Sequence, residues 1–495
     1  MISKKGVQSR RVENKNFLKH FMIIGGGTIL NLLLSLFTTP LITRMVAPVE
    51  YGQFSIFTMY SSMALIIFLL GMDQALLRFY YEENTIEFKR ALIFKCISLP
   101  AIITVIASAI VIGVTYSGII KFEFMPVVMI LLCIYTFIQV IYRFSLNTLR
   151  LEFKSKAFST LNIIQKICYI FFAVPLLYFS KSDYLLILVL ATVVASFICL
   201  MMSIFYQRSI WNIKALDMNA CTISTKDVLQ YSLPLILSMA ITTLFQAIDK
   251  ISLNYYCTYI EVGIYSSTLS LVSIFAIVQS TFNTLWNPLA TEHFINNRED
   301  RDFYQKGNQI ITVVMFFIGL SLILCKDIFS ILLGEKYREA AYILPFLIFH
   351  PIMYTISETT VTGISFMKKS NMQILIAASA CLTNIIGNIL LVPQLGCQGA
   401  AISTGVSYIV FFTMRTLISN KYFYIDFKLK KFYSLTVVTT LYALYNTFFL
   451  FNVWSVVGYM LCLALLVLLY KDTIRWGIGY LLNLMHNKVK IMESK

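Results

Sequence analysis

The chain has 495 residues, of which 58% are hydrophobic and 13% are charged. A soluble domain carries about a quarter charged residues, so this composition excludes a water-soluble globular enzyme and a disordered protein. The 40 Lys and Arg against 24 Asp and Glu give a net charge of +16, but the basic residues lie in short segments between apolar runs, which indicates orientation in a membrane rather than nucleic-acid binding.

Apolar runs long enough to cross a bilayer recur along the whole chain. In chain order they lie near residues 21–43, 52–71, 91–116, 125–146, 157–179, 184–206, 230–256, 262–288, 307–325, 339–365, 372–392, 398–418, 432–451 and 453–470. The sequence therefore predicts an all-α fold, a polytopic membrane helical bundle of about 14 transmembrane helices.

The connections between these runs alternate in charge. Most Lys and Arg, from Lys4 through Arg415 to Lys495, lie on the side of the N-terminus. The opposite side carries few: Arg44, Lys121, Lys181, Lys250, Lys326, Lys336 and Arg338. The positive-inside rule then predicts that both termini are cytoplasmic. Residues 471–495 mix Trp and Leu with basic residues, which predicts an amphipathic cytoplasmic tail at the inner leaflet, with a frayed tail as the alternative.

Two segments of the chain resemble each other at a constant offset. The segments 47–55 and 258–266 share a Glu, a Gly and a Ser, each pair 211 positions apart, and 153–156 weakly resembles 367–370 at an offset of 214. A duplicated half of six spans keeps one orientation, so the halves relate by an axis along the membrane normal. The predicted domains are an N-lobe (1–206, spans 1–6), a cytoplasmic interlobe linker (207–229), a C-lobe (230–418, spans 7–12), spans 13–14 (419–470) and the tail (471–495).

Four segments carry a resemblance to a known family. They are 43–52 (TRMVAPVEYG), 233–235 (LPL) leading to Asp249-Lys250, 333–341 (LGEKYREAA) and 396–404 (GCQGAAIST). Their order and content resemble the Wzx-type oligosaccharide flippases of polysaccharide biosynthesis, within the multidrug/oligosaccharidyl-lipid/polysaccharide exporter superfamily.

The resemblance implies a two-lobed, V-shaped bundle in the bacterial cytoplasmic (inner) membrane. Such a protein moves an undecaprenyl-diphosphate-linked oligosaccharide from the inner to the outer leaflet for O-antigen, capsule or a similar surface polysaccharide. The expected partners are this glycan lipid, membrane lipid, a polysaccharide polymerase and a chain-length regulator, with no nucleic acid. No cofactor is expected apart from a coupling Na⁺ or H⁺.

An anionic diphosphate needs positive charge within the membrane, where an ionisable residue costs about 2.5–3.5 kcal/mol or more. Lys166 lies about nine residues, or roughly 14 Å, inside its span, close to the midplane of a ~30 Å core. We predict that it faces a substrate cavity, with an interlobe or helix–helix ion pair that does not contact the cargo as the alternative. Lys250, Arg44 and Arg78 are the further substrate-binding candidates; the alternative for each is anchoring or snorkelling at the membrane surface.

Two acidic residues within spans are the candidates for ion coupling or gating. Glu358 lies at middle depth and is predicted to bind the coupling proton or sodium ion or to pair with Lys166, with a neutral structural role as the alternative. Asp249 directly precedes Lys250, and because neighbours on a helix are about 100° apart, the two are not expected to pair with each other.

Catalysis is not predicted. The sequence contains no H-E-x-x-H, Walker A, G-x-S-x-G or C-x-x-C motif, so neither a resident metal site nor a catalytic residue is assigned. Two transporter readings remain open beside the oligosaccharide flippase: a cation-coupled multidrug exporter and a lipid II flippase. A membrane glycan polymerase or ligase is disfavoured, because every predicted outer loop is short.

Overall fold

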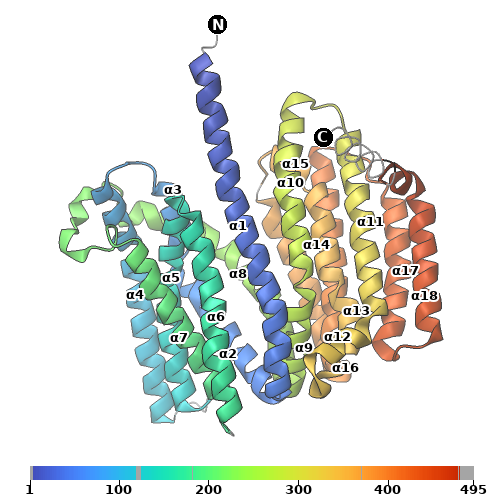
Figure 1. Ribbon diagram of the computed structural model, residues 1–495, viewed down its shortest axis with the longest axis horizontal. Coiled ribbons are helices and arrows are strands. Elements are labelled where there is room, and N and C mark those ends of the chain that lie inside the picture. The colour runs from blue at the N-terminus through green and yellow to red at the C-terminus, as the bar shows by residue number, and fades with distance from the viewer. Residues whose placement is uncertain (1–3, 119–123, 181, 370, 478, 480–495) are drawn as a thin grey trace, which may run out of the picture. The chain divides into compact units, whose positions relative to one another are not determined.

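The computed structural model describes residues 4–118, 124–180, 182–369, 371–477 and 479. In this part of the chain all regular structure is helical, which confirms the predicted all-α membrane bundle (Figure 1). The chain divides into two compact units, an N-terminal unit up to Ala247 and a C-terminal unit from Ile248.

The N-terminal unit is a bundle in which α6 packs against both α1 and α7, and α5 packs against both α4 and α7 (Figure 1). Its elements are α1 (Lys4–Met45), α2 (Pro48–Leu69), α3 (Met72–Phe79), α4 (Ile86–Ser117), α5 (Pro126–Leu151), α6 (Ser155–Phe179), α7 (Tyr184–Tyr206), η1 (Ile213–Ala215), η2 (Met218–Ala220) and the first part of α8 (Thr225–Tyr256).

In the C-terminal unit, α16 packs against α13 and α14, and α17 packs against α13 and α18 (Figure 1). After α8 its elements are α9 (Tyr259–Val272), α10 (Phe275–Asn296), α11 (Asp302–Leu324), α12 (Lys326–Leu333), η3 (Glu335–Tyr337), α13 (Ala340–Leu347), α14 (Phe349–Thr360), α15 (Thr362–Phe366), α16 (Met372–Tyr422), α17 (Leu429–Phe448) and α18 (Val453–Leu469).

The predicted number of 14 spans is not confirmed. Within the described residues, 10 helices are long and apolar enough to cross a membrane, or up to 12 when each bent helix pair counts as one span. One of the 10 is the 51-residue α16, which is broken at Gly396 (φ 56°, ψ −134°) and therefore consists of two helical arms. The polar α17 is not among them.

The connection after α7 is held on the N-terminal unit by two basic residues of α4. The Arg90 guanidinium donates to the backbone carbonyls of Ala215 and Ser209, and the Lys95 ammonium donates to the carbonyl of Ile223 at 2.7 Å. The start of α8 continues this contact, because Val228 is buried in the same apolar core as α3 and α4. The boundary between the two compact units falls within α8, between Ala247 and Ile248.

The two repeated segments begin equivalent helices. Ala47 and Thr258 are the extended N-cap residues of α2 and α9, so Glu50 and Glu261 occupy the same position in the first turn of their helices. The weaker repeat is also a shared turn, because Lys154 N–H donates to Leu149 and Lys369 N–H donates to Ile364, both at 2.9 Å. In this hydrogen-bond pattern a residue in the left-handed conformation ends the helix. The equivalent residues of the two turns are 215 positions apart, one more than the 214 positions between the matching sequence letters.

The C-terminal tail is described only at its beginning. After α18 the chain bends by 82° into a short helix, Lys471–Gly477. Most of the predicted amphipathic segment, residues 478 and 480–495, lies outside the described residues.

Candidate functional site

The most highly bonded carboxylate in a predicted span belongs to Asp249, on α8, which is 5% exposed. Its Oδ2 accepts hydrogen bonds from the hydroxyls of Tyr265 and Thr404, both at 2.7 Å. Its Oδ1 accepts from the side-chain amides of Asn384 at 3.0 Å and Asn388 at 2.8 Å. Four donors thus surround one buried carboxylate, which compensates much of its desolvation cost.

The break at Gly396 makes this cluster possible. It folds α16 back on itself, so that Asn384 and Asn388 come from the first arm and Thr404 comes from the second. The arms are also joined directly, since the Ser403 hydroxyl donates to Asn384 Oδ1 at 2.7 Å.

The same cluster contains a buried acceptor that is not used. Asn388 Oδ1 has no hydrogen-bond partner within the described residues. A carboxylate beside amide and hydroxyl oxygens is a ligand set suited to a proton or a hard cation. We name this group of five side chains, Asp249, Tyr265, Asn384, Asn388 and Thr404, the Asp249 cluster.

Lys250 follows Asp249 on α8 and is half-buried. Asp249 directs its hydrogen bonds to α9 and α16. No carboxylate lies within 4.0 Å of the Lys250 ammonium in the described part of the chain, so this lysine carries a charge that is not matched by a direct ion pair.

Glu358, on α14, forms an ion pair with Arg415 on the second arm of α16. The Arg415 Nη1 atom lies 2.8 Å from the Glu358 carboxylate and also donates to the Ser357 hydroxyl at 2.7 Å. The two charged side chains are only 11% and 7% exposed. The guanidinium lies beside the rings of Tyr354 and Phe411, at 5.6 and 5.5 Å from their centroids. Arg415 Nε keeps no partner among the described residues.

Lys166 lies on α6, 11 residues after the helix begins at Ser155, or about 16 Å along the axis. Its side chain is half-buried, and its ammonium is 5.9 Å from the centroid of the Tyr169 ring. No acidic side chain within the described ranges pairs with it inside 4.0 Å. The alternative of a static helix–helix ion pair therefore has no support within its own unit.

Arg44 and Arg78 differ from Lys166 in their exposure. Arg44 is exposed in the last turn of α1. Arg78 is 55% exposed and pairs at 3.5 Å with Glu82, which follows the end of α3. The neighbouring Asp73 is fully buried and pairs instead with Arg143 of α5 at 3.2 Å.

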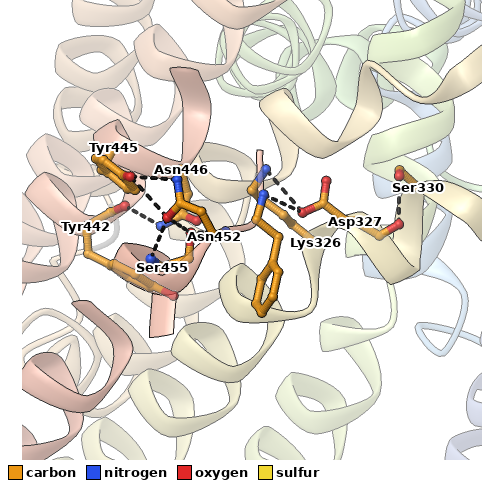
Figure 2. A network of polar contacts seen from close by, with 9 residues as sticks. Lys326, Asp327, Ser330, Tyr442, Tyr445, Asn446, Asn452 and Ser455 are labelled. Carbon is orange, nitrogen blue, oxygen red and sulfur yellow. Dashed lines mark hydrogen bonds and ion pairs between the residues drawn. The ribbon is translucent and has the colours of Figure 1, made fainter. Parts of the chain in front are cut away.

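A further polar network joins α12 to the turn between α17 and α18 (Figure 2). The Asp327 carboxylate accepts from the backbone N–H of Phe451 at 3.2 Å and lies 3.5 Å from the Lys326 ammonium, which is 1% exposed. Burial lowers the pKa of Lys326, against the opposing effect of Asp327. Beyond Phe451, Asn452 caps α18 through Ser455.

Glu261, Glu339 and Cys397 bring possible metal-ligating atoms within 4.8 Å of one another. The Glu261 carboxylate, however, accepts a 2.9 Å hydrogen bond from the backbone N–H of Cys397. It therefore caps the turn at Gly396, which accounts for the grouping without an ion.

Sequence reasoning did not find the partners of Asp249 and Glu358. Tyr265 and Thr404 fall inside the segments that carried the repeat and the family resemblance, but nothing in those segments pointed to Asp249. Asn384 and Asn388 are four positions apart in an apolar run, which places them on one face of a helix; that spacing was a usable signal. Arg415 was grouped with the cytoplasmic basic residues, because a basic residue near the end of an apolar run is typical of membrane anchoring.

Solved structures with a similar fold are transporters. Over 93% of this chain and 100% of the other, the structure resembles a lipid II flippase MurJ in an inward closed conformation, with a TM-score of 0.68 and 16% identity. It also resembles an inward-facing multidrug resistance MATE family transporter of the MOP superfamily, with a TM-score of 0.54 and 12% identity over 80% of this chain and 94% of the other. The chain therefore shares the fold of these proteins, and its long apolar helices make it a multi-pass membrane protein.

The family follows from the sequence match. Residues 41–342 match the polysaccharide biosynthesis protein family, and the chain belongs to that family. It is 25% identical over 225 residues to the capsular polysaccharide biosynthesis protein CapF of Staphylococcus aureus; the match covers 44% of this chain and 55% of that protein, so the chain spans about half the length of this curated relative. The resemblance to polysaccharide flippases predicted from the sequence is confirmed.

Proposed function

We propose that this protein flips undecaprenyl-diphosphate-linked oligosaccharide repeat units from the inner to the outer leaflet by alternating access, for the biosynthesis of a surface polysaccharide. The observation that carries the proposal is the match of residues 41–342 to a polysaccharide biosynthesis family in a chain with a transporter fold. The bacterial inner membrane, with both termini cytoplasmic, is the corresponding location, and a polymerase and a chain-length regulator are the corresponding partners.

Lys166 is the proposed contact for the diphosphate. Its ammonium is at mid-helix depth and has no direct ion pair among the described residues, so an anionic cargo compensates a charge that otherwise depends on water in the membrane interior. Lys250, nearer the end of its helix, likewise has no direct ion pair in the described part of the chain. The exposed Arg44 and Arg78 are proposed to meet the diphosphate near the ends of the spans, where an arginine can bind phosphate bidentately.

The Asp249 cluster is the proposed site of the coupling ion, a proton or Na⁺. Protonation or Na⁺ binding neutralises the buried carboxylate and changes which of the four donors it retains. Because these donors come from α9 and both arms of α16, occupancy of the site is linked to the packing of three helices. Glu358 is proposed as a gating residue through its ion pair with Arg415.

The proposal is tested with Lys166→Ala in a strain that depends on this protein for surface polysaccharide. We expect surface polysaccharide to be lost and the lipid-linked repeat unit to accumulate at the inner leaflet, while the protein remains inserted and abundant. Lys156→Ala is the matched control, since Lys156 is exposed in the first turn of the same helix, and it should leave surface polysaccharide unchanged.

Purified protein in proteoliposomes then separates the possible cargoes. The wild-type protein should move a labelled undecaprenyl-diphosphate oligosaccharide faster than lipid II or a cationic dye. Normal surface polysaccharide in the Lys166→Ala strain removes Lys166 from the mechanism. Transport of lipid II or of the dye alone refutes the proposed cargo.

A further inference from the structure

The N-terminal unit contains a cavity of about 440 Å³ that none of the proposed transport residues lines. Its walls come from α2, α4 and α5, together with Phe124, which precedes α5. A volume of this size is within the range of pockets that hold small organic ligands.

The chemistry of the walls favours an apolar ligand. The lining is mainly aliphatic and aromatic, with the rings of Tyr60, Phe68 and Phe124 among it. The few polar groups already have partners inside the protein: the Thr136 hydroxyl donates to the carbonyl of Leu132 at 2.8 Å, and the Cys133 thiol interacts with the Ser108 hydroxyl. An occupant therefore gains mainly apolar contact.

Small residues keep the cavity open. Ala64 of α2 and Ala107 of α4 line it, whereas the adjoining lipid-facing positions Ile67 and Ile106 carry large side chains that are 58% and 55% exposed. At these two positions of the wall the side chains are thus small, whereas the neighbouring surface positions are large.

The depth of the pocket indicates where its occupant comes from. Ala107 lies ten residues before the end of α4 and Cys133 lies seven residues after the start of α5, which is about 10–15 Å from that end of both helices. The charge pattern assigns this end to the outer face. Because the pocket is surrounded by membrane-spanning helices with exposed apolar faces, its occupant enters from the bilayer.

From the position, size and lining of this cavity we infer that it binds part of the polyprenyl chain of the transported lipid in the outer half of the membrane. This inference rests on the proposed function, which supplies a polyprenyl cargo. Methyl-branched isoprene units are bulkier than a straight acyl chain and can make more apolar contact with the aromatic and aliphatic side chains of the wall. The pocket then holds the tail on the side of the membrane where the head group is delivered.

The experiment uses the full chain in phosphatidylglycerol nanodiscs and a polyprenyl phosphate with a photoactivatable group in its chain. We expect cross-links to the α5 peptide that contains Cys133, competed by unlabelled polyprenyl phosphate. A photoactivatable phosphatidylglycerol serves as the comparison probe and should label this peptide weakly.

Matched variants test the pocket itself. Ala107→Trp fills it and should reduce the polyprenyl cross-link about tenfold, equivalent to about 1.4 kcal/mol, whereas Ile106→Trp adds the same ring on the adjacent lipid-facing position and should have no effect. Ala64→Leu, a smaller change on the opposite wall, is the second filling variant if Ala107→Trp does not fold. Retention of the cross-link in a folded filling variant overturns the inference, and so does equal labelling by the phosphatidylglycerol probe.

Failure of the inference can be distinguished from failure of the proposed function. A wild-type protein that is cross-linked in the pocket but moves no lipid-linked oligosaccharide refutes the proposed function and supports polyprenyl binding. A protein that transports the oligosaccharide and is not cross-linked there refutes the inference alone.

Discussion

Asp249 and Thr404 are 155 positions apart in the chain and are joined by a 2.7 Å hydrogen bond between the threonine hydroxyl and the carboxylate. This contact connects α8 to the second arm of α16, and Asn384 and Asn388 connect the same carboxylate to the first arm. One carboxylate therefore contacts both arms of the helical hairpin.

Asp249→Asn should uncouple transport from the ion gradient. The amide is close in shape to the carboxylate but binds neither a proton nor Na⁺ near neutral pH. Its NH₂ group also faces hydroxyl or amide donors whose hydrogen bonds the carboxylate accepts in the wild-type protein. We expect transport in proteoliposomes to lose its dependence on imposed proton and sodium gradients. Tyr265→Phe removes one donor and keeps the carboxylate, so it should weaken the response without abolishing it. An unchanged gradient dependence in Asp249→Asn would exclude the cluster as the coupling site.

Glu358→Gln should destabilise the C-terminal unit because it leaves the buried Arg415 guanidinium without its carboxylate. Breaking a buried pair in this way costs about 3–5 kcal/mol, which is measurable as a lower thermal midpoint of the detergent-solubilised protein. Adding Arg415→Met removes the remaining charge and should recover most of that loss.

The same double variant separates a structural from a gating role. If Glu358→Gln/Arg415→Met is stable and still transports at the wild-type rate, the ion pair contributes only to folding. A stable double variant with little transport supports the proposed gating role of Glu358.

The fold class and the identity of several charged residues could be predicted from the sequence, because long apolar runs and ionisable residues within them are local properties. The depth of Lys166 followed from its distance to the start of its span. The environment of Asp249 could not be predicted, because its four partners lie on α9 and on two arms of α16 that meet only through the turn at Gly396. Arg415 was assigned to the cytoplasmic side from its position near the end of an apolar run, yet α16 continues to Tyr422 and buries it beside Glu358.

Gly396→Ala should destabilise the hairpin of α16. Gly396 has a φ of 56° and a ψ of −134°, a conformation that costs a residue with a Cβ about 1–3 kcal/mol. An added Cβ would also lie 3.2 Å from the Glu261 carboxylate that caps this turn. Gly113→Ala is the control, since Gly113 lies in α4 with no atom within 4 Å of an added Cβ, and it should be neutral or slightly stabilising. Equal thermal midpoints for the two variants would contradict this account of the turn.

Asp327→Ala should loosen the turn between α17 and α18. The substitution removes the acceptor for the Phe451 N–H and leaves the Lys326 ammonium buried without its carboxylate (Figure 2). We expect faster hydrogen exchange at the Phe451 amide and a loss of stability of about 1–3 kcal/mol, the range for a buried polar group that loses its partner. Glu335→Ala is the control: Glu335 also pairs with a basic residue, Arg338, but is 90% exposed, and exposed pairs contribute about 1 kcal/mol or less. If both variants lose the same small amount of stability, the ion pair of the buried Lys326 contributes no more to the stability of the fold than the exposed pair does.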